Sequence, residues 1–481
     1  MARRALPPAL AGLEPKIVWK HFADLLRIPR CSGNEAGVRA HLEKFAKSKH
    51  LKAERDDAGN LLLRVRPEAP GPVVCLQGHM DMVGVAADGV QHDWTADPVT
   101  PRRDGDFIYA EGTTLGADNG IGLAFAMAMV DEQTGPLEIL CTVDEEVGLT
   151  GASAMKPNWL QAKFLVNLDS EEESSLTVAC SGGRDMVVTL PWPRAARTDG
   201  RETVAIRVKG LRGGHSGIDI NKGRSNANQV LGRVLAEVAR LGGALHEVAG
   251  GVKRNAIAPN ANAVVSLPAG KGDELKAAAE QIQRECATAS DPDLSIETAP
   301  GQTDLPPVAA EASERLVRLL EKLPHGVLKS TSHNPDLPFV SINLALINVV
   351  DDKLTVIMSG RSPVAGELDA LETRARAIAA EHGATFKTEN GYPGWAPNYD
   401  SPLLAITKRC YEQQFGRPPT LLEIHAGLEC GIIGSKHPGL DMISIGPDLH
   451  NPHSPQEHVS ISSAQRMYKL VKDLVAELQR S

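Results

Sequence analysis

The sequence lacks the features that mark membrane proteins and proteins that bind nucleic acids. In its 481 residues no apolar run is long enough to span a bilayer. The formal net charge is −9, and the acidic residues are spread along the chain without low-complexity segments. A phosphate-binding surface needs clustered Lys and Arg, so we expect neither nucleic acid nor a membrane as a partner.

Cysteine usage argues against a disulfide framework. The seven cysteines are scattered, odd in number and form no C-x-x-C pair. This pattern is typical of a reduced protein, so we expect a cytoplasmic location. The composition, 42% hydrophobic and 23% charged, is that of a globular protein. A chain of 481 residues exceeds what one core usually holds, and at least two domains are predicted.

One predicted strand end carries residues suited to metal chemistry. The apolar run Val73 to Leu76 predicts a buried strand, and after Gly78 the chain continues with His79 and Asp81. In an open α/β sheet, ligands bind beyond the carboxyl ends of the strands. His79 is there a candidate metal ligand, and Asp81 is a candidate to hold the other N–H of its imidazole. Such a triple is also common as a plain polar strand end.

Three more predicted strands end in histidine or carboxylate side chains. They are Leu137 to Val143, followed by Asp144, Glu145 and Glu146; Phe164 to Leu168, followed by Asp169; and Met442 to Ile445, followed by a loop with His450, His453 and His458. Adjacent carboxylates are costly to crowd together unless a positive charge lies between them. Four such strand ends favour a metal site over simple solvation.

Asp118 lies directly before a helix predicted over Ile121 to Asp131. The simpler interpretation is an N-cap, the commonest role of an aspartate at a helix start. The alternative is a carboxylate held beside a cation.

The middle of the chain has the pattern of an inserted domain. From about Arg201 to Glu381, strands, helices and paired strands follow one another as in an α+β unit. Pro191-Trp192-Pro193 marks its start, and Tyr392 to Pro397 marks its end. We predict one domain formed by residues 1–195 and 392–481, interrupted by an α+β domain over residues 196–391.

Taken together, the motifs resemble those of the M20 family of co-catalytic metallopeptidases, and among them the cytosolic dipeptidases of the aminoacyl-histidine (Xaa-His) dipeptidase type. The resemblance covers nearly the whole chain and keeps the motif order. The matching stretches are Gly78 to Asp81, Leu115 to Gly120, Asp144 to Gly148, Asn167 to Ser170, Gly213 to Gly217, Arg254 to Ile257, His425 to Gly431 and His453 to Pro455.

The resemblance implies a hydrolase that cleaves dipeptides with broad specificity and binds two divalent metal ions. It implies an α/β, phosphorylase/hydrolase-like catalytic domain with a mixed sheet, formed by residues 1–195 and 392–481. It also implies that the inserted α+β domain is a lid, and that the protein is a homodimer. One ion would bind His79 and Asp169, the other would bind Glu146 and His453, and Asp118 would bridge them. Imidazole and carboxylate ligands suit zinc, with cobalt or manganese as alternatives.

The resemblance also implies roles around these ions. Glu145 would act as general base on a water activated by the two metals, and Asp81 would orient His79. His215 would donate to the oxyanion, and Arg361 would bind the substrate carboxylate. Four residues are thus implied to contact the substrate: His215, Asn255, Arg361 and Gly427.

Several of these positions also have simpler interpretations. His215, in a glycine-rich loop, fits a surface histidine, and Arg361 fits a salt-bridged arginine. Asn255 fits a turn residue, and Glu429 fits an acid on a helix face. His450 and His458 compete with His453 as the metal ligand, and only the His-Ser-Pro match favours His453.

The chain departs from the family pattern after Ile257. Ala258, Pro259 and Asn260 stand where the family usually has proline and a basic-acidic pair. The preferred side chains of the substrate therefore stay open. An N-acyl-amino-acid deacylase or a tripeptidase would use the same site. An inactive peptide-binding relative is a further alternative, but the presence of Glu145 beside all five candidate ligands argues against it.

Overall fold

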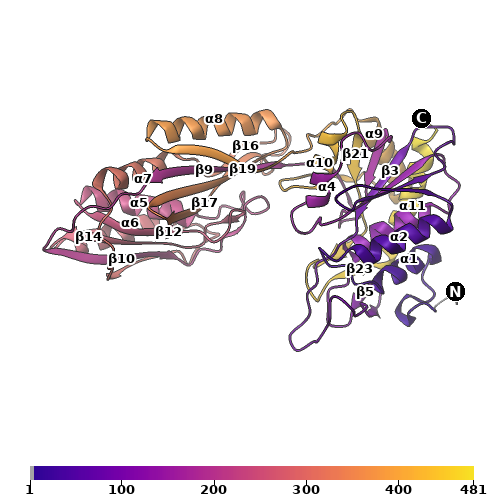
Figure 1. Cartoon of the computed structure of the whole chain (residues 1–481), viewed down its shortest axis with the longest axis horizontal. Helices are drawn as coiled ribbons and strands as arrows, with labels where there is room; N and C mark the ends of the chain where they lie inside the picture. Colours follow the sequence, from indigo (N-terminus) through magenta and orange to yellow (C-terminus); the bar gives the residue numbers. More distant parts are fainter. Residues whose placement is uncertain (1–4, 481) are drawn as a thin grey trace. The chain divides into compact units, whose positions relative to one another are not determined.

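The structure is a computed structural model that describes residues 5–480. The chain forms two compact units, each with its own hydrophobic core (Figure 1). Unit 1 takes the chain up to Ala179 and then Trp395–Glu423 and the residues from Leu428 onward. Unit 2 consists of Cys180–Gly394 and the short segment Ile424–Gly427.

The boundaries between the two units do not coincide with the proline-rich stretches of the sequence. The first lies after residue 179 rather than near 195, because β9 (Gly182–Pro191) pairs with β18 and β19 in the sheet of unit 2. The return of Ile424–Gly427 to unit 2 has no signal in the sequence. Whether unit 2 acts as a lid stays a prediction.

Unit 1 is built on an eight-stranded sheet whose order is β1-β2-β6-β3-β7-β21-β8-β20. Its strands are β1 (Lys52–Arg55), β2 (Leu61–Val65), β3 (Val74–His79), β6 (Leu137–Thr142), β7 (Phe164–Asn167), β8 (Ser175–Cys180), β20 (Thr420–Ile424) and β21 (Asp441–Ser444). β3 runs parallel to β6 and β7, and β21 runs parallel to β7. β1 is antiparallel to β2, β2 is antiparallel to β6, and β8 is antiparallel to β21. The predicted mixed α/β sheet is confirmed.

Several helices of unit 1 pack on this sheet and others pack on those helices or on a small second sheet. The helices are η1 (Pro8–Leu10), α1 (Lys16–Leu26), α2 (Ala36–Ser48), α3 (Ala117–Met129), α4 (Thr150–Ala154), α9 (Pro402–Phe415), α10 (Glu429–Lys436) and α11 (Ile461–Leu478). The second sheet has the order β22-β23-β5-β4, with β4 (Pro101–Asp104), β5 (Phe107–Ala110), β22 (Leu449–His450) and β23 (His458–Ser460). α3 contacts α1, β3 and α11, and its residues from Asn119 to Met129 are buried, as expected for a helix that is apolar on all sides.

Unit 2 is built on a nine-stranded sheet with the order β15-β10-β14-β12-β17-β18-β9-β19, in which β16 pairs with β17. Its strands besides β9 are β10 (Arg201–Lys209), β12 (Ala244–Gly250), β14 (Ala261–Pro268), β15 (Ser295–Pro300), β16 (Gly326–Ser330), β17 (Pro338–Val350), β18 (Lys353–Ser362) and β19 (Thr385–Tyr392). The helices are α5 (Ala227–Arg240), α6 (Gly272–Cys286), α7 (Ala310–Lys322) and α8 (Ala365–Glu381). β11 (Gly214–His215) pairs with β13 (Ala256–Ile257) outside the large sheet.

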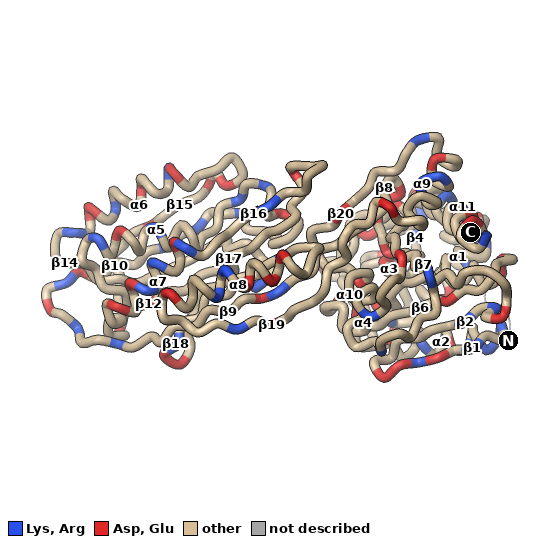
Figure 2. Tube along the Cα trace, turned by 90° about the horizontal axis from the view of Figure 1, so that it is seen from above, with Lys and Arg blue, Asp and Glu red and all other residues tan. Residues whose placement is uncertain are grey.

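Acidic and basic residues are interspersed along the traces of both units (Figure 2). Within residues 5–480, every helix is too short or too polar to serve as a membrane span.

Candidate metal centre

The four strand ends that carry histidine or carboxylate residues lie side by side. β6, β3, β7 and β21 are consecutive in the sheet and parallel, so their carboxyl ends share one edge. His79 is the last residue of β3, and Asp169 follows β7 by two residues. Gly78 permits this arrangement, because a Cβ there would lie 2.1 Å from Oδ1 of Asn119 on α3.

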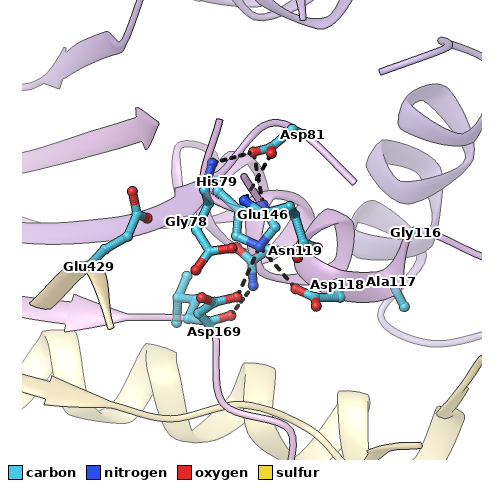
Figure 3. Close-up of polar contacts among 12 residues, drawn as sticks. Gly78, His79, Asp81, Gly116, Ala117, Asp118, Asn119, Glu146, Asp169 and Glu429 are labelled. Atoms are coloured by element: carbon cyan, nitrogen blue, oxygen red, sulfur yellow. Dashed lines mark hydrogen bonds and ion pairs between the residues drawn. The ribbon is translucent and has the colours of Figure 1, made fainter. Parts of the chain in front are cut away.

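The first group of candidate ligands is His79, Asp118 and Asp169 (Figure 3). Nε2 of His79 lies 2.9 Å from Oδ1 of Asp118 and 3.3 Å from Oδ1 of Asp169. Ligands about 2.0–2.1 Å from a tetrahedral ion are separated from one another by roughly 3.3 Å. The spacing of the three side chains therefore fits a common ion.

The second group is Asp118, Glu146 and His453. Nε2 of His453 lies 2.9 Å from Oε2 of Glu146 and 3.4 Å from Oδ2 of Asp118. Asp118 thus faces His79 with one oxygen and His453 with the other. A carboxylate in this position can bridge two cations.

The acidic groups of this site repel one another in the absence of a cation. Burial and the charges of Asp118 and Glu146 raise the pKa of Asp169 to about 6, although His79 opposes the shift. Burial raises the pKa of Glu145 to about 9, with Asp169, Glu429 and Glu146 adding to the shift and His79 opposing it. Bound cations invert such shifts, because they favour the ionised carboxylates.

Hydrogen bonds to Asp118 and Glu146 raise the pKa of His453 to about 10, although burial lowers it. A metal ion at Nε2 would replace this proton, so binding would release it.

Asp81 holds three parts of the site together. Its Oδ1 lies 3.3 Å from Nδ1 of His79 and accepts a hydrogen bond from the backbone N–H of Glu145 at 3.1 Å. Its Oδ2 accepts from the N–H of Glu146 at 3.2 Å and from the hydroxyl of Ser32 at 2.8 Å. Burial raises the pKa of Asp81, but the bonds from His79, Ser32 and Glu145 prevail and lower it to about 2. Asp81 therefore positions the Glu145-Glu146 turn as well as the imidazole.

The sequence model described as peptidase family M20/M25/M40 matches residues 75–477. The chain belongs to this family. The resemblance of the motifs is thereby confirmed, and the family implies a divalent metal cofactor, for which the two groups above are the candidate ligands.

Relatives of high coverage agree with this assignment. The chain is 37% identical to the cytosol non-specific dipeptidase of Escherichia coli (strain K12), covering 98% of this chain and 99% of the relative. Its fold matches the structure of aminoacylhistidine dipeptidase from Vibrio alginolyticus with a TM-score of 0.90 and 34% identity over 97% of each chain. Aminopeptidase PepT from Bacillus cereus ATCC 10987 shares the fold at 16% identity, with a TM-score of 0.56 over 97% of this chain and 99% of that one.

Two residues of this M20 peptidase were not identified from the sequence, although their side chains bind the backbone of the segments that carry candidate ligands. The buried carboxylate of Glu457 accepts hydrogen bonds from four consecutive N–H groups at the start of α3, those of Leu115 to Asp118, at 2.7–3.2 Å. The buried guanidinium of Arg30 donates to the carbonyls of Met80, Asp81 and Gly116. No local pattern marks either residue, because all these partners are distant in the chain.

Glu429 lies at one end of a buried hydrogen-bond network among side chains of the four strands that carry the ligands. Its Oε2 accepts from Nε2 of Gln77 at 2.6 Å and from the hydroxyl of Thr142 at 2.8 Å. Oε1 of Gln77 in turn accepts from Nδ2 of Asn167 at 2.6 Å, and the hydroxyl of Ser444 donates to Asn167. The network thus links β6, β3, β7 and β21, and Glu429 is a buried partner of the strand ends rather than a surface acid.

The competing histidines lie elsewhere in unit 1. His450 and His458 are opposite each other in β22 and β23, and both rings contact Phe107. Neither belongs to a group of candidate ligands among the described residues.

In unit 2, Arg361 is held by hydroxyl groups. Its Nε and Nη2 lie 3.3 Å from the hydroxyl of Ser216, and its Nη1 donates to the hydroxyl of Tyr392 at 2.7 Å. The side chain is buried without a carboxylate partner among the hydrogen bonds and ion pairs of residues 5–480. This differs from the salt-bridged arginine of the simpler interpretation.

His215 lies near this arginine in a defined tautomer. Its Nδ1 accepts hydrogen bonds from the N–H groups of Gly217 and Ile218, each at 3.2 Å. Because Nδ1 accepts these bonds, the ring proton lies on Nε2. Burial and the charge of Arg361 lower the pKa of the ring. Asn255 is exposed, and its backbone carbonyl accepts from the N–H of Ser216 at 2.9 Å.

The returning segment Ile424–Gly427 is anchored by His425. Its Nδ1 lies 2.9 Å from the hydroxyl of Ser181, and its Nε2 lies 2.6 Å from that of Ser341. Gly427, two residues on, is partly buried in the same segment.

Proposed function

We propose that the protein is a metal-dependent dipeptidase that hydrolyses the peptide bond of dipeptides with broad specificity, using a water activated by two divalent metal ions. The observation that carries the proposal is the position of Asp118, whose two oxygens face His79 and His453. Two candidate ligand groups that share one carboxylate suit a two-ion hydrolase.

The donor set fits such ions. His79, Asp118 and Asp169 would hold one ion, and Asp118, Glu146 and His453 would hold the other. Oε1 of Glu146 is buried and has no hydrogen-bond partner among the described residues, as expected for an oxygen placed to bind a cation. Nitrogen and oxygen donors favour zinc, with cobalt or manganese as alternatives.

The ions would lower the pKa of a bound water and polarise the scissile carbonyl. Glu145 accepts the proton of the attacking water and passes it to the leaving amine. One oxygen of Glu145 lies within 4.8 Å of candidate ligand atoms of His79 and Glu146, so its carboxylate is beside residues that would hold the ions. Asp81 keeps Glu145 there through the bond to its backbone N–H.

Unit 2 supplies the groups proposed to bind the substrate. Arg361 presents a fork of donors suited to a terminal carboxylate, and Ser216 and Tyr392 fix its orientation. The N–H at Nε2 of His215 is a donor for the oxyanion that forms during attack. Asn255 and Gly427 are proposed as further substrate contacts.

The names of the relatives support the substrate class, since one is a non-specific dipeptidase and another an aminoacylhistidine dipeptidase. We therefore include Xaa-His dipeptides among the proposed substrates. The cytoplasmic location and the homodimer stay predictions.

The test is a panel of dipeptides, including Ala-Ala and Ala-His, incubated with chelator-treated protein and with the same protein reloaded with zinc, manganese or cobalt. We expect free amino acids only after reloading. Release of amino acids from N-acyl amino acids or tripeptides, but not from dipeptides, would favour the deacylase or tripeptidase alternative.

A further inference from the structure

One buried side chain holds the short segment Ile424–Gly427, in which the chain returns to unit 2. Both ring nitrogens of His425 meet hydroxyl groups: Nδ1 lies 2.9 Å from that of Ser181, and Nε2 lies 2.6 Å from that of Ser341. Burial lowers the pKa of the ring to about 3, so the imidazole is neutral at neutral pH and has one donor and one acceptor. Two hydroxyl groups satisfy both nitrogens.

The backbone of His425 lies against the turn that carries His215. A Cβ on Gly217 would lie 2.1 Å from the carbonyl oxygen of His425, so the two backbones are in contact and only glycine fits between them. Gly217 follows Ser216, and its N–H donates to Nδ1 of His215. The carbonyl of His425 therefore determines how closely this turn packs on the returning segment.

These contacts form a closed ring that includes Arg361. Arg361 and Ser341 are directly opposite each other in the ladder of β18 and β17, so their side chains lie on the same face of the sheet. From Arg361 the ring runs to the hydroxyl of Ser216 at 3.3 Å, through Gly217 to the carbonyl of His425, and through its imidazole to Ser341. His425 closes the ring, because it contacts the turn with its backbone and β17 with its side chain.

β17 holds the same turn at a second point. Asn343, two residues after Ser341, donates from Nδ2 to the carbonyl of Ala256 at 2.8 Å. Ala256 is in turn paired with His215 in the ladder of β13 and β11. The turn is therefore held from two sides, and loss of the bond between His425 and Ser341 would leave only one.

We propose that His425 is a positioning residue for substrate binding, which holds the turn of His215 and Ser216 and thereby keeps Arg361 aimed at the terminal carboxylate. This inference rests on the proposed function and deepens it. All members of the ring belong to unit 2, whereas the candidate metal ligands belong to unit 1. Loss of His425 should therefore impair recognition of the carboxylate and leave metal binding intact.

The test measures kcat/KM of the zinc-loaded protein on Ala-Ala and on its C-terminal amide. His425→Leu should lower kcat/KM on Ala-Ala about 10-fold and leave that on the amide unchanged, so that discrimination between them falls about 10-fold. Metal content should equal that of the wild type. The control is His246→Gln, which changes another buried histidine of unit 2, bonded to Ser266 and to the carbonyl of Leu305. It should keep both rates.

Conservative variants separate the two bonds of the ring. The amide of glutamine can take the place of Nε2 and that of asparagine the place of Nδ1, so His425→Gln should restore discrimination and His425→Asn should not. Ser341→Ala and Ser181→Ala repeat this comparison with the imidazole in place, which keeps the test valid if His425→Leu does not fold. Ser341→Ala should lose discrimination, and Ser181→Ala should keep it.

Three results would overturn the inference. They are unchanged discrimination in Ser341→Ala and His425→Leu, equal losses on Ala-Ala and its amide, which indicate a merely structural role, and equal effects of Ser341→Ala and Ser181→Ala. A wild type inactive on every dipeptide after metal loading would instead refute the proposed function, and the two failures are distinguishable.

Discussion

The carboxylate of Glu457 accepts a hydrogen bond of 3.2 Å from the backbone N–H of Asp118, although 339 residues separate them in the chain. Glu457 lies four residues after His453 and accepts three more bonds from the start of α3. Four hydrogen bonds therefore join the loop that carries His453 directly to the start of the helix that carries Asp118. A negative charge at the amino terminus of a helix is also stabilised by the helix dipole.

Replacing Glu457 by Gln should weaken metal binding without removing any ligand. The amide keeps one accepting oxygen, so about half of the bonds to the start of α3 are lost, and Asp118 is held less firmly beside His453. We expect metal affinity to fall about 10- to 100-fold, measured by competition with a chelating dye. Glu43→Gln, at an exposed position on α2, is the control and should bind as the wild type. Unchanged affinity in Glu457→Gln would contradict this role.

Glu145→Gln should stop catalysis and keep the metals. The amide cannot accept the proton of the attacking water, whereas the backbone N–H that binds Asp81 remains. We expect kcat to fall about 10²- to 10⁴-fold, with metal content by elemental analysis close to that of the wild type. A variant that lost its metals would show that Glu145 is a ligand instead.

The two candidate groups predict different metal stoichiometries. His79→Ala and His453→Ala should each retain one tightly bound ion, because each removes a ligand of one group only. Asp118→Ala should retain none, since both groups share this carboxylate. His450→Ala is the control and should keep two ions, because its ring packs on Phe107. Isothermal titration of the stripped proteins measures the stoichiometry, and equal loss in His450→Ala and His453→Ala would argue against the assignment.

Arg361→Lys should impair recognition of the substrate carboxylate. Lysine presents a point charge and cannot reproduce the fork that Ser216 and Tyr392 orient. We expect kcat/KM on dipeptides to fall by about one to two decades at unchanged metal content. The wild type should cleave amidated dipeptides poorly, and the variant should discriminate less against them. If the wild type hydrolyses both forms equally, Arg361 does not bind the carboxylate.

Buried histidines predict that stability falls in mild acid. Burial lowers the pKa of His325 to about 4, whereas an unfolded histidine titrates near about 6.5. As pH falls below the unfolded value, the unfolded state binds the proton first, so stability is full above that value and is lost as pH falls toward the folded pKa. At pH 5 the loss from His325 is about 2 kcal/mol. Urea unfolding of chelator-treated protein should show a smaller loss between pH 7 and pH 5 in His325→Gln than in wild type, and equal losses would contradict the assignment.

The secondary structure around the site followed from local sequence patterns. The apolar run before His79 and the run before Asp169 predicted strands, and both are present as β3 and β7. Their charged ends could be recognised because a buried strand that ends in acids or histidine is costly unless a cation is near. The family could also be recognised from local sequence, because its motifs are short and contiguous.

Long-range contacts decided the remaining features, and neighbouring residues carry no signal for them. Glu457 and Arg30 bind backbone groups far along the chain, so neither stands in a recognisable motif. β9 could be read as part of the first domain, because only its pairing with β18 assigns it to unit 2. The His-Ser-Pro motif favoured His453 over His450, but only the folded loop brings Nε2 of His453 to 3.4 Å from Oδ2 of Asp118. A hydrogen bond or an ion pair depends on distance in space, and that distance exists only once the chain has packed.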